Sequence, residues 1–111
     1  KADSKEYFLT PNYDLLNTRF HINKKYGDMA IDLLDDYTST YEAYGYYTYD
    51  DFKTFAKYID LLEIRFNKIM KFIEDSYQEV EILIDKSFLS PKAKEFYKES
   101  YKDRMKRLRL K

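Results

Sequence analysis

A three-four rhythm of apolar side chains runs through residues 50–88. The steps between apolar positions alternate between three and four residues, and only Ser76 interrupts them. This spacing places the apolar groups along one side of an α-helix. The positions are Phe52, Phe55, Ile59, Leu62, Phe66, Ile69, Ile73, Val80 and Leu83. The pattern predicts a long helix over about 50–88, and the rest of the chain is expected to cover its apolar seam.

A similar but weaker rhythm predicts a first long helix over about 11–44. Thr10 and Pro11 are a typical helix start, because a hydroxyl caps the first turn and proline is tolerated at the first helical position. Residues 1–9 precede this start and are expected to form a loose tail. The short connection to the next helix predicts that the two long helices lie antiparallel.

The middle of this first helix allows a second interpretation. Asn23 and Gly27 occupy positions on its apolar face. Gly27 and Asp28 are also suited to end one helix and cap another, which would break the element at 24–28. We favour the continuous helix, because the apolar register is kept across this stretch.

Residues 45–49 are predicted to form the turn. Gly45 is suited to end a helix, and Thr48 with Asp51 resembles a capping box in which Asp replaces the usual Glu. Further along, Ser90 and Pro91 repeat the cap-then-proline start and predict a third helix over about 91–110.

These elements predict a single all-α domain over 1–111. It would consist of a long antiparallel helical hairpin with a shorter third helix, a three-helix bundle with coiled-coil-like packing. The composition agrees, because only 2 Gly and 2 Pro occur in 111 residues and β-rich domains use more of both in their turns. Apolar positions beyond the seam of the second helix call for an additional neighbour, which leaves a homodimer compatible with the sequence.

Composition also excludes several kinds of catalytic and binding site. The chain has no Cys, which excludes disulfides and thiolate sites, and it has one histidine, His21. The glycines are isolated, so no phosphate-binding loop is present. We therefore predict no catalytic residue, no metal site and no cofactor, and expect a protein that is not an enzyme.

The net charge of zero hides an uneven distribution. Residues 91–111 carry nine basic and three acidic groups, whereas residues 1–49 and 50–90 are each acidic by three charges. The favoured interpretation is that the basic third helix packs against the acidic hairpin. Binding to an anionic membrane surface is an alternative, and nucleic-acid binding is disfavoured because the domain is not basic overall. The candidate residues on this helix are Lys98, Lys102, Lys106, Arg107 and Arg109.

Tyrosine is the second distinctive feature, with 13 in the chain. Tyr combines apolar area with a hydroxyl, which suits interfaces as well as half-buried packing. A cluster near the predicted turn is the other candidate interaction surface. Its members are Tyr41, Tyr44, Tyr46, Tyr47 and Tyr49.

The sequence thus predicts a non-enzymatic helical interaction module that binds a protein partner. No apolar run approaches the roughly 20 residues that cross a bilayer. The chain begins at Lys1 and its first residues are polar, which weakly favours the exposed domain of a secreted or lipid-anchored protein. The alternatives are a small cytoplasmic regulator of the immunity-protein type, or a membrane- or nucleic-acid-associated module that uses the basic helix.

Overall fold

The computed structural model describes residues 10–13, 18–21 and 32–109. All regular elements in these ranges are helices, which confirms the all-α class. They are α1 (Thr18–His21), α2 (Ser39–Tyr44), α3 (Tyr49–Tyr58), α4 (Glu63–Asp75), α5 (Tyr77–Lys86) and α6 (Pro91–Arg107).

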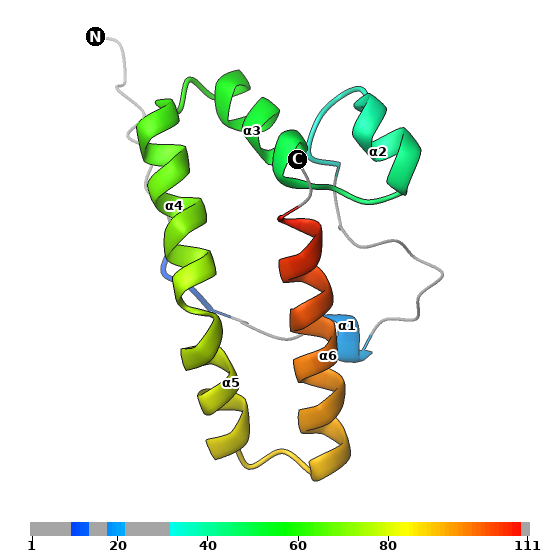
Figure 1. The fold of residues 1–111 in the computed structure, drawn as a ribbon, viewed down its shortest axis with the longest axis vertical. Helices are drawn as coiled ribbons and strands as arrows, with labels where there is room; N and C mark the ends of the chain where they lie inside the picture. The colour runs from blue at the N-terminus through cyan, green and yellow to red at the C-terminus, as the bar shows by residue number, and fades with distance from the viewer. Residues whose placement is uncertain (1–9, 14–17, 22–31, 110–111) are drawn as a thin grey trace, which may run out of the picture.

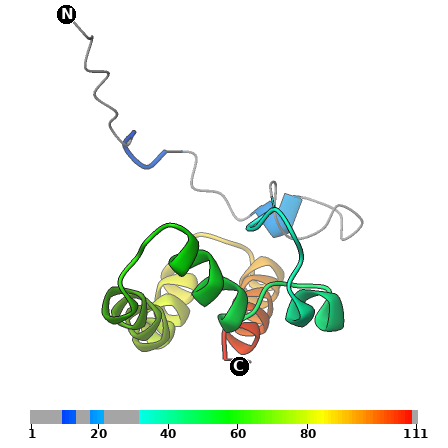
Figure 2. The same ribbon diagram turned by 90° about the horizontal axis from the view of Figure 1, so that it is seen from above.

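The centre of the fold is formed by α4, α5 and α6. Helix α5 continues the direction of α4, and α6 runs back beside them in the opposite direction (Figure 1). Helix α3 crosses the end of the molecule at which α4 begins and α6 ends (Figure 1). Helix α1 packs against α6, where the rings of Phe20 and Phe96 lie 5.5 Å apart in an edge-to-face arrangement. From above, α4 and α2 lie on opposite sides of the C-terminal end of α6 (Figure 2).

The predicted continuous helix over 11–44 is wrong. Residues 10–13 and 32–38 are not helical, and only α1 and the six-residue α2 form within the described parts of that range. A tertiary contact replaces a helical hydrogen bond here. The backbone N–H of Leu33 donates to the hydroxyl of Tyr47 at 3.0 Å. The stretch around Asn23 and Gly27 lies outside the described residues.

A side-chain cap also explains why α2 begins so late. The Oγ of Thr38 accepts a hydrogen bond from the backbone N–H of Tyr41 at 3.1 Å, which makes Thr38 the N-cap. Ser, Thr and Asp side chains offer such alternatives to helical pairing, and residues 32–40 are rich in them. The predicted hairpin of two long helices is therefore not formed.

The predicted helix over 50–88 is also divided, first between α3 and α4. The N–H of Leu61 bonds to the carbonyl of Ala56 at 2.8 Å, and the N–H of Asp60 bonds to that of Lys57 at 3.1 Å. This is the hydrogen-bond pattern of a Schellman motif, with Asp60 in the left-handed position at φ 55°. The usual Gly is replaced by Asp, so the sequence carries no conventional stop at this point.

The second division, at Ser76, is much milder. Backbone bonds continue through it, from Ser76 N–H to the Phe72 carbonyl at 3.0 Å and from Val80 N–H to the Ser76 carbonyl at 3.1 Å. The Ser76 hydroxyl also donates to the Phe72 carbonyl at 2.8 Å. Such back-bonding by Ser often bends a helix without ending it, which is consistent with α4 and α5 sharing one direction.

Because the predicted helix is divided, its apolar residues do not form a single seam. Phe66 is buried, whereas Ile59, Leu62 and Leu83 are exposed. The break between α3 and α4 changes the direction of the chain, so residues on either side no longer share one face. Instead, the core of the described residues is small and drawn from several elements: Tyr47, Ala56, Phe66, Ile84, Ala93 and Met105.

Three of the helix boundaries predicted from local caps are correct, whereas the start predicted at Thr10 and Pro11 is wrong, because residues 10–13 are not helical. Gly45 ends α2 in the left-handed conformation at φ 70°, and Thr48 with Asp51 forms the capping box of α3. Ser90 caps α6, its Oγ accepting from the N–H of Ala93 at 3.3 Å, and Pro91 is the first helical residue. Helix α6 ends at Arg107, slightly before the predicted end at 110.

Candidate interaction surface

Tyrosine rings surround α2 and the loop that follows it. The rings of Tyr37 and Tyr41 are stacked with centroids 4.4 Å apart, and Tyr41 also contacts Tyr47 at 4.5 Å. Tyr44 and Tyr46 form a second stacked pair at 5.8 Å. Aromatic pairs at these separations are favourable beyond the area they bury, so the rings hold one another in place.

Tyr47 belongs to the core and not to the accessible part of this cluster. Only 9% of its surface is exposed, and its hydroxyl donates to Oδ1 of Asp32 at 3.3 Å. Burial raises the pKa of the Tyr47 phenol, and the nearby Asp32 carboxylate raises this pKa further, while the hydrogen bond from the Leu33 N–H opposes the rise. Of the predicted tyrosine residues, Tyr47 therefore has a structural role.

The two candidate surfaces predicted from the sequence meet at Tyr46 and Arg107. The guanidinium carbon of Arg107 lies 4.2 Å from the centroid of the Tyr46 ring, a cation–π arrangement. An ion pair of 2.7 Å between Arg107 and Asp103, one turn earlier on α6, helps to orient the guanidinium. We call Tyr41, Tyr44, Tyr46 and Arg107 the tyrosine–arginine surface.

A groove lies on the other side of the α6 C-terminal end, between α6 and α4. Its volume is about 450 Å³, and Arg109 bonds to Glu74 across it at 3.2 Å. The hydroxyl of Tyr49 donates to Oδ1 of Asn67 at 3.2 Å, and its ring packs edge-to-face on Phe66. The groove is lined by Tyr49, Asn67, Met70, Lys71, Ile73, Glu74, Met105, Leu108 and Arg109.

Lys98 lies elsewhere on α6 and faces α5. Its Nζ bonds to the Asp85 carboxylate at 2.7 Å, and this hydrogen bond raises the pKa of Lys98. The Arg109–Glu74 pair lies just beyond the end of α6, and the two ion pairs join the basic C-terminal segment to the acidic α4–α5 segment, as the internal-packing interpretation predicts. Lys102 and Lys106 are exposed, and Lys102 borders the hollow between α5 and α6 together with Glu81 and Asp85.

Sequence reasoning missed several residues of these surfaces. Tyr37 was not singled out, although it stacks on Tyr41 and is 53% exposed. Asn67, Met70 and Met105 line the groove but come from two helices that are distant in sequence. No local pattern links such positions, so only the packing of α4 against α6 reveals them.

No protein-family model, curated protein or solved structure matches this chain. Among the residues that the structure describes, no helix is both long and apolar enough to cross a membrane. The same residues contain no group of three or more His, Cys, Asp or Glu side chains placed to hold a metal ion. The function therefore has to be argued from the surfaces themselves.

Proposed function

We propose that this protein is a non-enzymatic helical interaction module that binds a protein partner through the tyrosine–arginine surface. The contact between Tyr46 and Arg107 carries the proposal, because it joins the tyrosine cluster to the basic helix. Tyr and Arg are the residue types, with Trp, that dominate binding energy at protein interfaces. One residue of the basic set, Arg107, thus lies against the tyrosine cluster, whereas Lys98 and Arg109 pair with acidic residues of α5 and α4.

The rings of this surface are also prearranged for binding. Tyr44 is 52% exposed while its ring stacks on Tyr46, and Tyr41 is held between Tyr37 and Tyr47. A side chain that is already ordered loses less conformational entropy when a partner covers it. The surface can therefore offer apolar area and hydroxyl groups at low entropic cost.

Charge indicates the chemistry of the partner. Lys102 and Lys106 are exposed on the neighbouring turns of α6, and the acidic Asp103 is paired with Arg107. The α6 side of the surface is therefore basic, whereas its α2 side is acidic, with Asp35, Asp36 and Glu42 exposed, and this suits a partner with charges of both signs around an apolar contact.

Affinity capture with single-residue variants tests this proposal. The full chain carrying Tyr44→Ala, and separately Lys106→Glu, would be used as bait against an extract of the cells that produce it. Tyr44→Ala removes an exposed ring and is expected to weaken partner binding about tenfold or more, the effect of an interface hot spot. Lys106→Glu reverses a rim charge and is expected to slow association.

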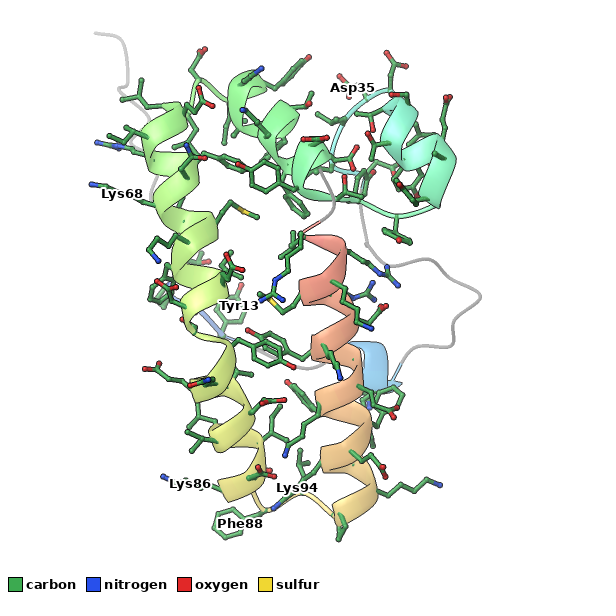
Figure 3. The ribbon with its side chains drawn as sticks, viewed as in Figure 1. Tyr13, Asp35, Lys68, Lys86, Phe88 and Lys94 are labelled. Atoms are coloured by element: carbon green, nitrogen blue, oxygen red, sulfur yellow. The ribbon has the colours of Figure 1, made fainter. Side chains whose placement is uncertain are left out.

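Lys68→Glu is the matched control, since Lys68 is exposed on α4 and points away from α6 (Figure 3). Circular dichroism must show that all three variants retain the helix content of the parent. The proposal is contradicted if both surface variants retain every partner that the parent and Lys68→Glu retain. A gel shift that weakens steeply with salt would instead support the nucleic-acid alternative.

A further inference from the structure

The turn between α5 and α6 forms the opposite end of the molecule from the tyrosine–arginine surface (Figure 1). Residues 87–90 make this turn. The Ser87 hydroxyl donates to the Ile84 carbonyl at 2.6 Å, and Ser90 caps α6 by accepting from Ala93. Hydroxyl groups thus close both helix ends, and the shape of the turn does not depend on its two apolar side chains.

Those two side chains are exposed. Phe88 is fully exposed and Leu89 is 42% exposed, while Leu83, one turn before the end of α5, is 66% exposed. Figure 3 shows the Phe88 ring directed away from the end of the helix pair. A single exposed apolar residue is ordinary on a protein surface, but Phe88 and Leu89 are adjacent in the turn, and Leu83 belongs to the last turn of α5.

The same end carries more basic than acidic side chains. Residues 85–95 contain three basic side chains and two acidic ones, Asp85 and Glu95. Of these, Asp85 is already paired with Lys98 at 2.7 Å. The basic side chains are Lys86, Lys92 and Lys94. Lys86 and Lys92 are exposed, whereas the Nζ of Lys94 donates to the Asp85 carbonyl of α5 at 2.6 Å, so only Lys86 and Lys92 are available to a partner surface.

We propose that this turn binds the surface of an anionic lipid bilayer by inserting Phe88 and Leu89 into the interfacial region. The lysines on either side would then lie at the level of the lipid headgroups, where basic side chains are attracted by anionic lipid. An apolar tip with basic flanks matches both layers of such a surface, the charged headgroups and the acyl boundary beneath them. A partner protein would need a complementary acidic rim around a single deep apolar socket.

The attachment is weak and reversible by this account. Each lysine close to an anionic surface strengthens binding by a factor of about five, and only two apolar side chains enter the bilayer. Binding of this strength is measurable at millimolar lipid and depends on ionic strength. It orients the molecule with the tyrosine–arginine surface facing away from the membrane, where a protein partner has access.

Vesicle sedimentation tests the proposal with the full chain. Two kinds of vesicle are used: phosphatidylcholine alone, and three parts phosphatidylcholine with one part phosphatidylserine. The parent protein is expected to bind the phosphatidylserine vesicles more strongly, with less binding at higher salt. Phe88→Ser is expected to weaken this binding about fivefold or more, and Lys92→Gln about fivefold.

Two controls separate the tip from other exposed residues. Phe72→Ser removes an equally apolar ring that is 71% exposed on α4, and should leave vesicle binding unchanged. The double change Lys102→Gln and Lys106→Gln removes basic charge from the other end of α6. Because Phe88 is fully exposed, Phe88→Ser should have the same thermal unfolding temperature as the parent protein.

Three results would overturn the proposal. They are absence of vesicle binding at millimolar lipid, equal binding to both kinds of vesicle, and binding that Phe88→Ser leaves intact. Loss of binding in the Lys102 and Lys106 double variant, with Phe88→Ser unaffected, would assign membrane contact to the other end of α6. None of these outcomes depends on partner capture by the tyrosine–arginine surface, so the two proposals fail separately.

Discussion

The carboxylate of Asp51 accepts hydrogen bonds from both the backbone N–H and the hydroxyl of Thr48, at 2.7 and 2.9 Å. Both residues are completely buried. The hydroxyl of Thr38, the N-cap of α2, donates to the other oxygen of the same carboxylate. One side chain therefore caps α3 and ties it to the start of α2, and this junction positions the loop that carries Tyr46.

Replacing Asp51 with Ala is expected to lower the free energy of unfolding by about 2–4 kcal/mol. The change removes three hydrogen bonds to a charged group, and it leaves the buried donors of Thr48 and the half-buried hydroxyl of Thr38 without this acceptor. Asp51→Asn retains an acceptor and should cost less than Asp51→Ala. Urea denaturation measures both effects, with Asp35→Ala at an exposed position as the control. A loss in Asp51→Ala no larger than that in the control would show that the junction contributes little.

Asp60→Gly is expected to preserve or increase stability. Asp60 adopts φ 55°, a left-handed conformation that costs most L-residues roughly 1–2 kcal/mol and that Gly adopts freely. Asp60→Ala should destabilise by about 1 kcal/mol, because Ala lacks the local polar side chain that makes Asp tolerant of this conformation. Thermal unfolding of the two variants checks the order. An Asp60→Ala variant more stable than Asp60→Gly would contradict the Schellman geometry at this helix end.

Tyr47 is expected to make the protein sensitive to alkali. Its raised pKa means that the folded state holds the phenolic proton more tightly than the unfolded state. This contribution to stability is complete below the unfolded pKa of about 10 and is lost as the pH rises from there through the folded pKa. Stability should therefore fall more steeply above about pH 10 in the parent than in Tyr47→Phe.

At neutral pH the parent should be more stable than Tyr47→Phe. Tyr47→Phe loses the hydrogen bonds with Leu33 and Asp32 and is expected to be less stable by about 1 kcal/mol. Tyr58→Phe is the control, since Tyr58 is 74% exposed and should change neither value. Denaturant titrations at neutral pH and above pH 10 measure both effects. Parallel pH profiles for the parent and Tyr47→Phe would contradict the role of Tyr47.

The candidate surfaces were only partly predictable. Tyr41, Tyr44, Tyr46 and Arg107 were selected from composition and charge, yet nothing in the sequence placed the tyrosine cluster beside α6. Tyr47 was chosen for the same reasons as its neighbours, but folding buries it. Burial depends on which elements pack around a side chain. The sequence around a Tyr in a polar stretch does not show whether that Tyr will be buried or exposed.

The sequence by itself determined the all-α class and the helix ends that rest on local chemistry. Gly45, the pair Thr48 and Asp51, and the pair Ser90 and Pro91 act through hydrogen bonds and backbone conformations within a few residues, so each is readable where it stands. The tertiary structure decided where the long apolar patterns break. Residues 32–38 use a distant hydroxyl in place of a helical bond, and Asp60 adopts a left-handed conformation that the apolar rhythm cannot reveal. It also decided that Tyr46 meets Arg107, because a contact between residues so far apart exists only once the connection between α2 and α3 lies beside α6.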